Sequence, residues 1–156
     1  VAFSSTSRDG FAKAHEISAF SLLPLAEGAA ALMKKRGGGS IISMSFIGSV
    51  LAVPHYHVMG PAKASLEASS RYLAKEVGPD NIRVNVISPG PIKTLSASGI
   101  KDFAELMKIG GAHSAMKRTV TQEEVAQTAV FLASDASSGI TGQVIYVDCG
   151  YSIMAN

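Results

Sequence analysis

The sequence predicts an α/β fold, a doubly wound parallel sheet with helices on both of its faces. Two observations support this prediction. Helical and strand patterns alternate along the 156 residues, and each strand is short, apolar and without clean alternation, as in a sheet that is covered on both sides. In chain order we expect a helix over 9–36, a strand over 40–45, a helix over 56–77, a strand over 81–88, a helix after Thr121 and a strand over 142–150.

The ends of the expected helices carry recognisable signals. Asp9 can cap the first helix, which ends in basic residues followed by the glycines 37–39. Gly78 and Pro79 close the second helix. Thr121, with Glu124 three residues later, forms a capping box for the third. The glycines 37–39 stand between a helix and a strand, the reverse of the order in a phosphate-binding loop, so we do not expect them to bind phosphate.

Composition excludes several classes of function. The net charge of +2 is too small and too scattered to predict nucleic acid binding. The single Cys149 excludes an internal disulfide, fits a reducing compartment and is expected to be a small buried residue. The apolar part of 19–33 is broken by Pro24 and Glu27, so no membrane span is expected. His55 and His57 lack further ligands nearby, so no metal site is expected.

Tyr56 and Lys63 are the candidate catalytic pair. Seven helical residues turn through roughly 700°, so the two side chains would share a face, roughly 10 Å apart. A nearby ammonium favours the ionised form of a tyrosine and strengthens it as a hydrogen-bond donor. Tyr56 follows the strand over 40–45, and the stretch 89–94, PGPIKT, follows the next strand. Both therefore lie at the carboxyl edge of the sheet, where ligands of such folds bind.

Three stretches of the chain carry a family resemblance: YHVMGPAKASLEASSRYLA, RVNVISPGPIKTLSASGIKDF and GQVIYVDCGYSI. With them, the chain resembles the C-terminal part of a Rossmann-like short-chain dehydrogenase/reductase, and more narrowly the enoyl-acyl-carrier-protein reductases. The larger branch of that superfamily spaces its Tyr and Lys four residues apart, whereas the enoyl reductases use seven, as here. The resemblance covers residues 1–156 as the C-terminal portion of a single dinucleotide-binding reductase domain.

The resemblance implies an activity and roles for individual residues. The activity is reduction of the trans-2 double bond of enoyl-acyl-carrier protein in fatty acid synthesis, with NAD(H) in preference to NADP(H). Tyr56 would hydrogen-bond the thioester carbonyl and stabilise the enolate, and Lys63 would hold the nicotinamide ribose. The remaining roles are cofactor binding by Ile92, Lys93, Thr94, Leu95 and Ser96, and a substrate pocket of Phe46, Met59, Ile100 and Phe103 under a lid over 96–106.

Phe46 departs from many relatives, which carry a second tyrosine there. The larger superfamily branch needs a serine hydroxyl at this position, and phenylalanine donates no hydrogen bond. Phe46 therefore favours a pocket wall over a role in reducing ketones.

The glycine-rich turn that binds the dinucleotide in this superfamily is not in the sequence. We expect it in an N-terminal segment that precedes Val1 or is supplied separately, since the strand over 40–45 would otherwise keep an unpaired apolar edge. The residues that decide between NADH and NADPH would lie in that segment.

Two alternatives remain open: another short-chain reductase that acts on carbonyls, and a non-catalytic fragment that only assembles into oligomers. The helices over 9–36 and 56–77 resemble those that pack subunits into homotetramers in the superfamily. The expected location is the cytoplasm of a bacterium, or a plastid-type organelle in a eukaryote.

Overall fold

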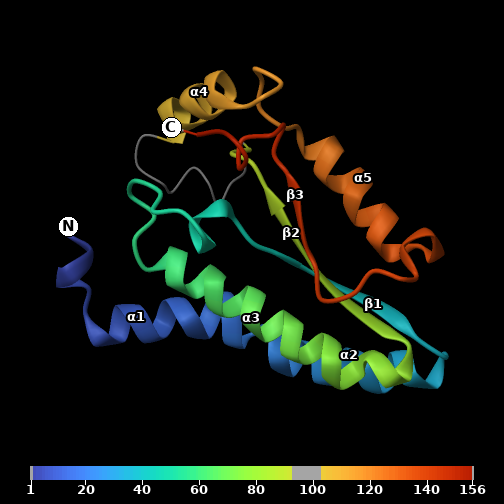
Figure 1. Ribbon diagram of the computed structural model, residues 1–156. Helices are drawn as coiled ribbons and strands as arrows, with labels where there is room; N and C mark the ends of the chain where they lie inside the picture. Colours follow the sequence, from blue (N-terminus) through green and yellow to red (C-terminus); the bar gives the residue numbers. More distant parts are fainter. Residues whose placement is uncertain (1, 93–102, 156) are drawn as a thin grey trace.

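A computed structural model describes residues 2–92 and 103–155, with the backbone alone at 103, 104 and 106. It shows a parallel sheet with the strand order β1-β2-β3 and helices on both faces (Figure 1). The α/β fold class is therefore confirmed, and every expected strand overlaps an observed one. The strands are β1 (Gly39–Met44), β2 (Ile82–Pro89) and β3 (Val144–Val147), and the helices are α1 (Arg8–His15), α2 (Leu22–Lys35), α3 (Met59–Val77), α4 (Phe103–His113) and α5 (Gln122–Ala133).

The first expected helix is interrupted by one wide turn. Between α1 and α2 the chain forms a π-helical turn over Glu16–Phe20, where the Ser21 N–H donates to the Glu16 carbonyl oxygen at 3.1 Å. Pro24 explains its place, because a proline offers no N–H to the carbonyl four residues earlier, that of Phe20, and its ring crowds that carbonyl. The predicted cap was wrong. Ser7, not Asp9, accepts the hydrogen bond from Gly10 N, and Asp9 lies in the first turn.

The helical stretch Arg8–Lys35 has 28 residues and, by length and composition alone, could cross a membrane. The core helix of a soluble protein passes the same test, so the absence of a membrane span stays a prediction. The stretch Arg8–Lys35 carries exposed apolar side chains, among them Ile17, Phe20, Leu23, Leu25 and Leu32.

Two cores sandwich the sheet. One lies between the sheet and the layer of α2 and α3, and the other lies under α5 on the opposite face (Figure 1). β2 is central and almost wholly buried, and it contributes the buried apolar residues Ile82, Val84, Val86 and Ile87. The first core contains Ala19, Leu22, Ala26, Leu66, Leu73, Ala74, Val77, Ile82 and Val84, and the second contains Ile87, Val120, Val125 and Leu132.

The carboxyl ends of the strands meet at one edge of the sheet, as expected for parallel strands. The ladder continues past the end of β1, where Ser45 N donates to the Ile87 carbonyl oxygen at 2.8 Å. It also continues past β2, where Gly90 N donates to the Val147 carbonyl oxygen at 3.0 Å. The loops that follow β1 and β2 are therefore held side by side at this edge, and α4 lies at the same end in Figure 1.

The predicted capping box of α5 is confirmed. Thr121 Oγ1 accepts from Glu124 N at 3.2 Å, and Glu124 Oε2 accepts from Thr121 N at 2.9 Å. Arg118 binds the same carboxylate, with Nη2 and Oε1 2.6 Å apart.

β1 is an edge strand of the sheet. Within the described ranges, no strand pairs with its outer side.

Candidate active site

Lys63 is anchored at the end of β1. Its Nζ donates to the carbonyl oxygen of Met44, the last residue of the strand, at 2.9 Å. Lys63 lies in the second turn of α3, which covers this face of the sheet. Helix packing therefore brings the ammonium to the carboxyl edge, as the sequence predicts.

Tyr56 lies before α3 rather than on it, so the predicted shared helical face was wrong. The helix begins at Met59, and residues 54–58 form turns in which His55 and His57 have positive φ angles of 62° and 45°. Pro61 explains the late start, because proline fits in the first turn of a helix but would interrupt one that began at Tyr56.

The Tyr56 ring is held by Phe46 and Gly48. The rings of Tyr56 and Phe46 meet edge to face, with their centroids 5.0 Å apart. A Cβ atom at Gly48 would lie 2.4 Å from Tyr56 Cδ1, and one at Gly60 would lie 2.8 Å from the Gly48 carbonyl oxygen. Only glycine at both positions allows this approach. The ring of Tyr56 and the ammonium of Lys63 are thus both anchored on residues 44–48.

Burial controls the protonation of both groups. It raises the pKa of Tyr56 to about 12, so the phenol is neutral at physiological pH. The sequence predicted the opposite direction for the pKa of Tyr56, from the charge of Lys63, but the shift comes from the loss of solvation on burial. Burial also lowers the pKa of Lys63, and attraction to Glu67 partly opposes this. The arrangement provides a neutral hydrogen-bond donor and a lysine that are each held by residues at the end of β1.

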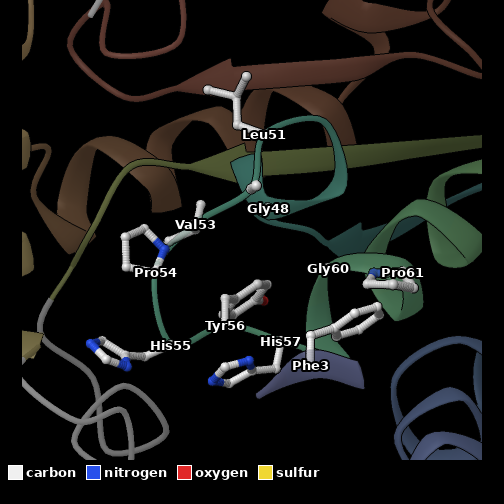
Figure 2. A pocket seen from close by; sticks show the side chains of 11 residues that line it. Phe3, Gly48, Leu51, Val53, Pro54, His55, Tyr56, His57, Gly60 and Pro61 are labelled. Atoms are coloured by element: carbon white, nitrogen blue, oxygen red, sulfur yellow. The ribbon is translucent and has the colours of Figure 1, made fainter. Parts of the chain in front are cut away.

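A cavity of about 470 Å³ surrounds Tyr56. Figure 2 shows the Tyr56 ring near its centre, with the imidazoles of His55 and His57 directed away from the ring. Most of the lining is apolar, which suits an acyl chain better than a charged ligand. The lining residues are Phe3, Gly48, Leu51, Ala52, Val53, Pro54, His55, Tyr56, His57, Gly60 and Pro61.

The structure describes only some of the other predicted site residues. Ile92 packs its side chain on the core under α5. Met59 is half-buried, receives a 3.9 Å contact from Ser18 Oγ, and is not among the residues that line the cavity. Phe103 begins α4, and its side chain is not described. Lys93, Thr94, Leu95, Ser96 and Ile100 lie outside the described residues. The roles of all these residues stay predictions.

No group of three or more potential metal ligands gathers anywhere in the part of the chain that the structure describes. The rings of His55 and His57 are 6.4 Å apart. The expectation that the protein binds no metal at His55 and His57 stays a prediction.

Glu67 is a site residue that the sequence reasoning missed. It is only 7% exposed, and its carboxylate accepts a hydrogen bond from Ser45 Oγ at the end of β1. The available signal was its position one turn after Lys63, in a stretch of small and apolar residues that predicts a buried helix face.

Comparison with known proteins agrees with this geometry. The profile of the enoyl-(acyl carrier protein) reductase family matches residues 1–152. An NADH-dependent enoyl-acyl-carrier-protein reductase of Nostoc is 57% identical over 152 residues, which cover 97% of this chain and 58% of that protein. The corresponding Bacillus subtilis enzyme is 51% identical over 150 residues, or 96% of this chain and 57% of the enzyme. The chain thus spans somewhat more than half the length of these relatives.

Solved structures of related enzymes have the same fold. The Bacillus cereus enoyl-acyl-carrier-protein reductase, solved with NADP⁺ and an indole naphthyridinone, has a TM-score of 0.95 and 49% identity, over 100% of this chain and 60% of that one. The Anaplasma phagocytophilum reductase, solved with NAD, has a TM-score of 0.92 and 38% identity, over 100% of this chain and 56% of that one. On its sequence and its fold, the chain belongs to the enoyl-(acyl carrier protein) reductase family.

Proposed function

We propose that this chain, completed by an N-terminal segment, reduces the trans-2 double bond of enoyl groups on acyl-carrier protein with NADH, in fatty acid synthesis. Its membership of the reductase family supports this, as do relatives named as NADH-dependent enzymes of this kind. One observation carries the proposal. Tyr56 and Lys63 are both anchored on the few residues that end β1, Lys63 on the Met44 carbonyl and Tyr56 on the Phe46 ring.

Tyr56 is suited to stabilise negative charge on a substrate oxygen. NADH, when bound, supplies the hydride that reaches the β-carbon of the enoyl thioester. Negative charge then develops on the thioester oxygen, and a neutral phenol with a pKa of about 12 can donate a hydrogen bond there without being ionised itself. The contacts with Phe46 and Gly48 hold the ring in advance, so little reorganisation is needed.

Lys63 is suited to hold the ribose beside the nicotinamide. Its ammonium has several N–H donors, one of which bonds to Met44, and the others can meet sugar hydroxyls. The backbone of Ile92, at the neighbouring strand end, would meet the carboxamide, and residues 93–96 would continue along the cofactor. The preference for NAD(H) over NADP(H) rests on the relatives' names.

A carbonyl substrate fits this site less well. Phe46 offers no hydroxyl beside Tyr56, and the hydroxyl of the preceding Ser45 donates to the buried Glu67. An alkene conjugated to a thioester needs one donor for one oxygen, and Tyr56 supplies it.

The partners follow from the surfaces that the chain leaves uncovered. The outer edge of β1, which is unpaired within the described residues, fits a parallel strand from the N-terminal segment, which would also bring the glycine-rich turn. The apolar outer side of Arg8–Lys35, with a groove of about 590 Å³ between α2 and α3, fits a second copy of the chain in a homotetramer. The bacterial relatives favour a cytoplasmic location.

The test is NADH oxidation with a trans-2-enoyl thioester, by this chain alone and with the N-terminal part of the Nostoc relative. Activity is expected only with that part present. Tyr56→Phe should lower kcat by about 10²–10³-fold with little change in KM, since it removes one donor to the developing charge. Lys63→Ala should mainly weaken NADH binding, measured by quenching of the cofactor's fluorescence.

Matched controls come from α3 itself. Tyr72→Phe and Lys75→Ala change an exposed tyrosine and an exposed lysine of the same helix and should leave both parameters unchanged. Equal losses of rate and binding from Tyr56→Phe and from Lys63→Ala would contradict these roles. Oxidation of NADH with a ketone but not with the enoyl thioester would favour the carbonyl alternative.

A further inference from the structure

A buried carboxylate lies one helical turn behind the lysine of the site. Glu67 and Ser45 are 7% and 5% exposed, and Ser45 Oγ donates to Glu67 Oε1 in a short hydrogen bond. Lys63, four residues earlier on α3, donates to the carbonyl oxygen of Met44. Two consecutive residues of the β1 end are thus held by two residues of α3 that share one side of the helix.

This contact is more than a packing detail, because burying a carboxylate is costly without strong partners. A core of this kind usually places apolar side chains at such positions. The Ser45 hydroxyl satisfies one carboxylate oxygen, and Ser45 N continues the sheet ladder to Ile87. Hydrogen bonds therefore hold both the side chain and the backbone N–H of Ser45. The next residue, Phe46, packs on Tyr56.

The charge of Glu67 reaches the titratable groups around it. Within the described ranges, it is the one charged side chain that shifts the pKa of Lys63, which it raises against the effect of burial. On β3, burial raises the pKa of Tyr146, and the negative charges of Glu67 and Asp148 raise it further. Tyr56 titrates at a much higher pH, about 12, through burial alone.

We propose that Glu67 is a positioning residue of the reductase proposed above: through Ser45 it fixes the end of β1 beneath Tyr56, and its charge stabilises the ammonium form of Lys63. The two effects are separable. Glu67→Gln keeps an oxygen that can accept from Ser45 and removes the charge. Ser45→Ala keeps the charge and removes the hydrogen bond.

The charge effect is tested first without cofactor or substrate. The ¹³Cε resonance of Lys63, assigned with Lys63→Arg, is titrated in the assembled protein. Glu67→Gln should move the Lys63 midpoint to lower pH, whereas Ser45→Ala should leave it in place. Glu76→Gln, an exposed glutamate on the same helix, is the control and should also leave it in place. An unchanged midpoint in Glu67→Gln overturns the role of the charge.

Kinetics then separate the two effects. The protonated lysine is the binding form, so NADH affinity is complete below the pKa of Lys63 and is lost as the pH rises through it. In Glu67→Gln this loss should begin at lower pH, so its kcat/KM relative to wild type should fall about tenfold across that range. Ser45→Ala should lower kcat about tenfold at every pH, because it loosens the support of Phe46 and Tyr56, and a small misplacement of a catalytic group lowers the rate. Wild-type kcat in Ser45→Ala would overturn the fixing role.

If Glu67→Gln does not fold, the Ser45→Ala/Glu67→Met double variant carries the same test of charge, because it leaves neither buried partner unpaired. The outcomes also separate this inference from the proposed function. An inactive wild-type assembly with a shifted Lys63 midpoint refutes only the reductase proposal. An active wild type with no shift refutes only the role of Glu67.

Discussion

Replacing Gly48 by alanine should displace the Tyr56 ring without removing any group that takes part in the proposed chemistry. The added Cβ would lie 2.4 Å from Tyr56 Cδ1 and 2.7 Å from Cε1, whereas ordinary contacts begin near 3.4 Å. The ring must therefore retreat by about 1 Å, the difference between 3.4 and 2.4 Å. Gly48 does not have a positive φ, so alanine can adopt its backbone conformation and the whole effect is steric.

The ring cannot retreat freely, because Phe46 packs against it edge to face. A displacement of about 1 Å in a catalytic group can cost about 10²-fold in rate. Overpacking of this kind costs about 1–3 kcal/mol of folding free energy. We therefore expect kcat/KM for the enoyl thioester to fall about 10²-fold in Gly48→Ala, while the protein stays folded.

The assay compares steady-state NADH oxidation with thermal unfolding for the same variants. Gly139→Ala is the matched control, since nothing lies within 4 Å of its added Cβ, and its activity should not change. In a Tyr56→Phe background, Gly48→Ala should cost little further activity, because both changes act on the same hydroxyl. Gly48→Ala with a rate within about threefold of wild type would refute the claim that this contact positions Tyr56.

Three further predictions concern protonation and backbone strain. The Tyr56 phenol should ionise near pH 12, which can be followed as the absorbance component at 295 nm that Tyr56→Phe lacks. Burial raises its pKa above the ordinary value of 10, so its contribution to folding stability is present below pH 10 and is lost between pH 10 and about 12. A midpoint near pH 10 would contradict the burial of the phenol. Hydrogen bonds from Arg118 and Thr121 lower the pKa of Glu124 to about 2. In acid-unfolding curves, wild type should therefore be more stable than Glu124→Gln above about pH 4.5, and this difference should disappear as the pH falls toward 2. A difference in stability that persists at pH 2 would exclude this cause. His57→Val should destabilise the protein by about 1–2 kcal/mol in urea unfolding, because a β-branched residue is strained at a φ of 45°. His57→Asn should have almost no effect on stability, because asparagine tolerates this conformation. Equal effects of the two substitutions would show that the conformation is not strained.

The fold was predictable because its signals are local and redundant. Short apolar runs alternating with helical patterns gave the parallel sheet, and the Thr121–Glu124 box gave the start of α5 within one residue. The start of α3 was missed, although Pro61 marks it, because the seven-residue spacing of Tyr56 and Lys63 was interpreted as helical geometry. The positive φ angles at His55 and His57 could not be predicted, since histidine adopts a left-handed conformation more often than most residues but still does so only in a small minority of cases.

The protonation of Tyr56 could not be predicted from the sequence. Spacing alone suggested that Lys63 lowers the pKa of Tyr56, but the depth at which the ring is buried depends on packing by residues 46–48. Glu67 was missed for a related reason, since its burial and its partner at the end of β1 depend on how α3 docks against the sheet.

The division of this site between local and distant parts has a physical consequence. The contacts that fix the phenol of Tyr56 and the ammonium of Lys63 all lie within the 20 residues from Met44 to Lys63. The glycine-rich turn that would bind most of the dinucleotide lies outside this sequence in our proposal. An N-terminal segment from a relative should therefore restore cofactor affinity without rebuilding the catalytic geometry. Variants within residues 44–67 should then lower kcat or Lys63-dependent binding in any such assembly, whichever relative supplies the segment.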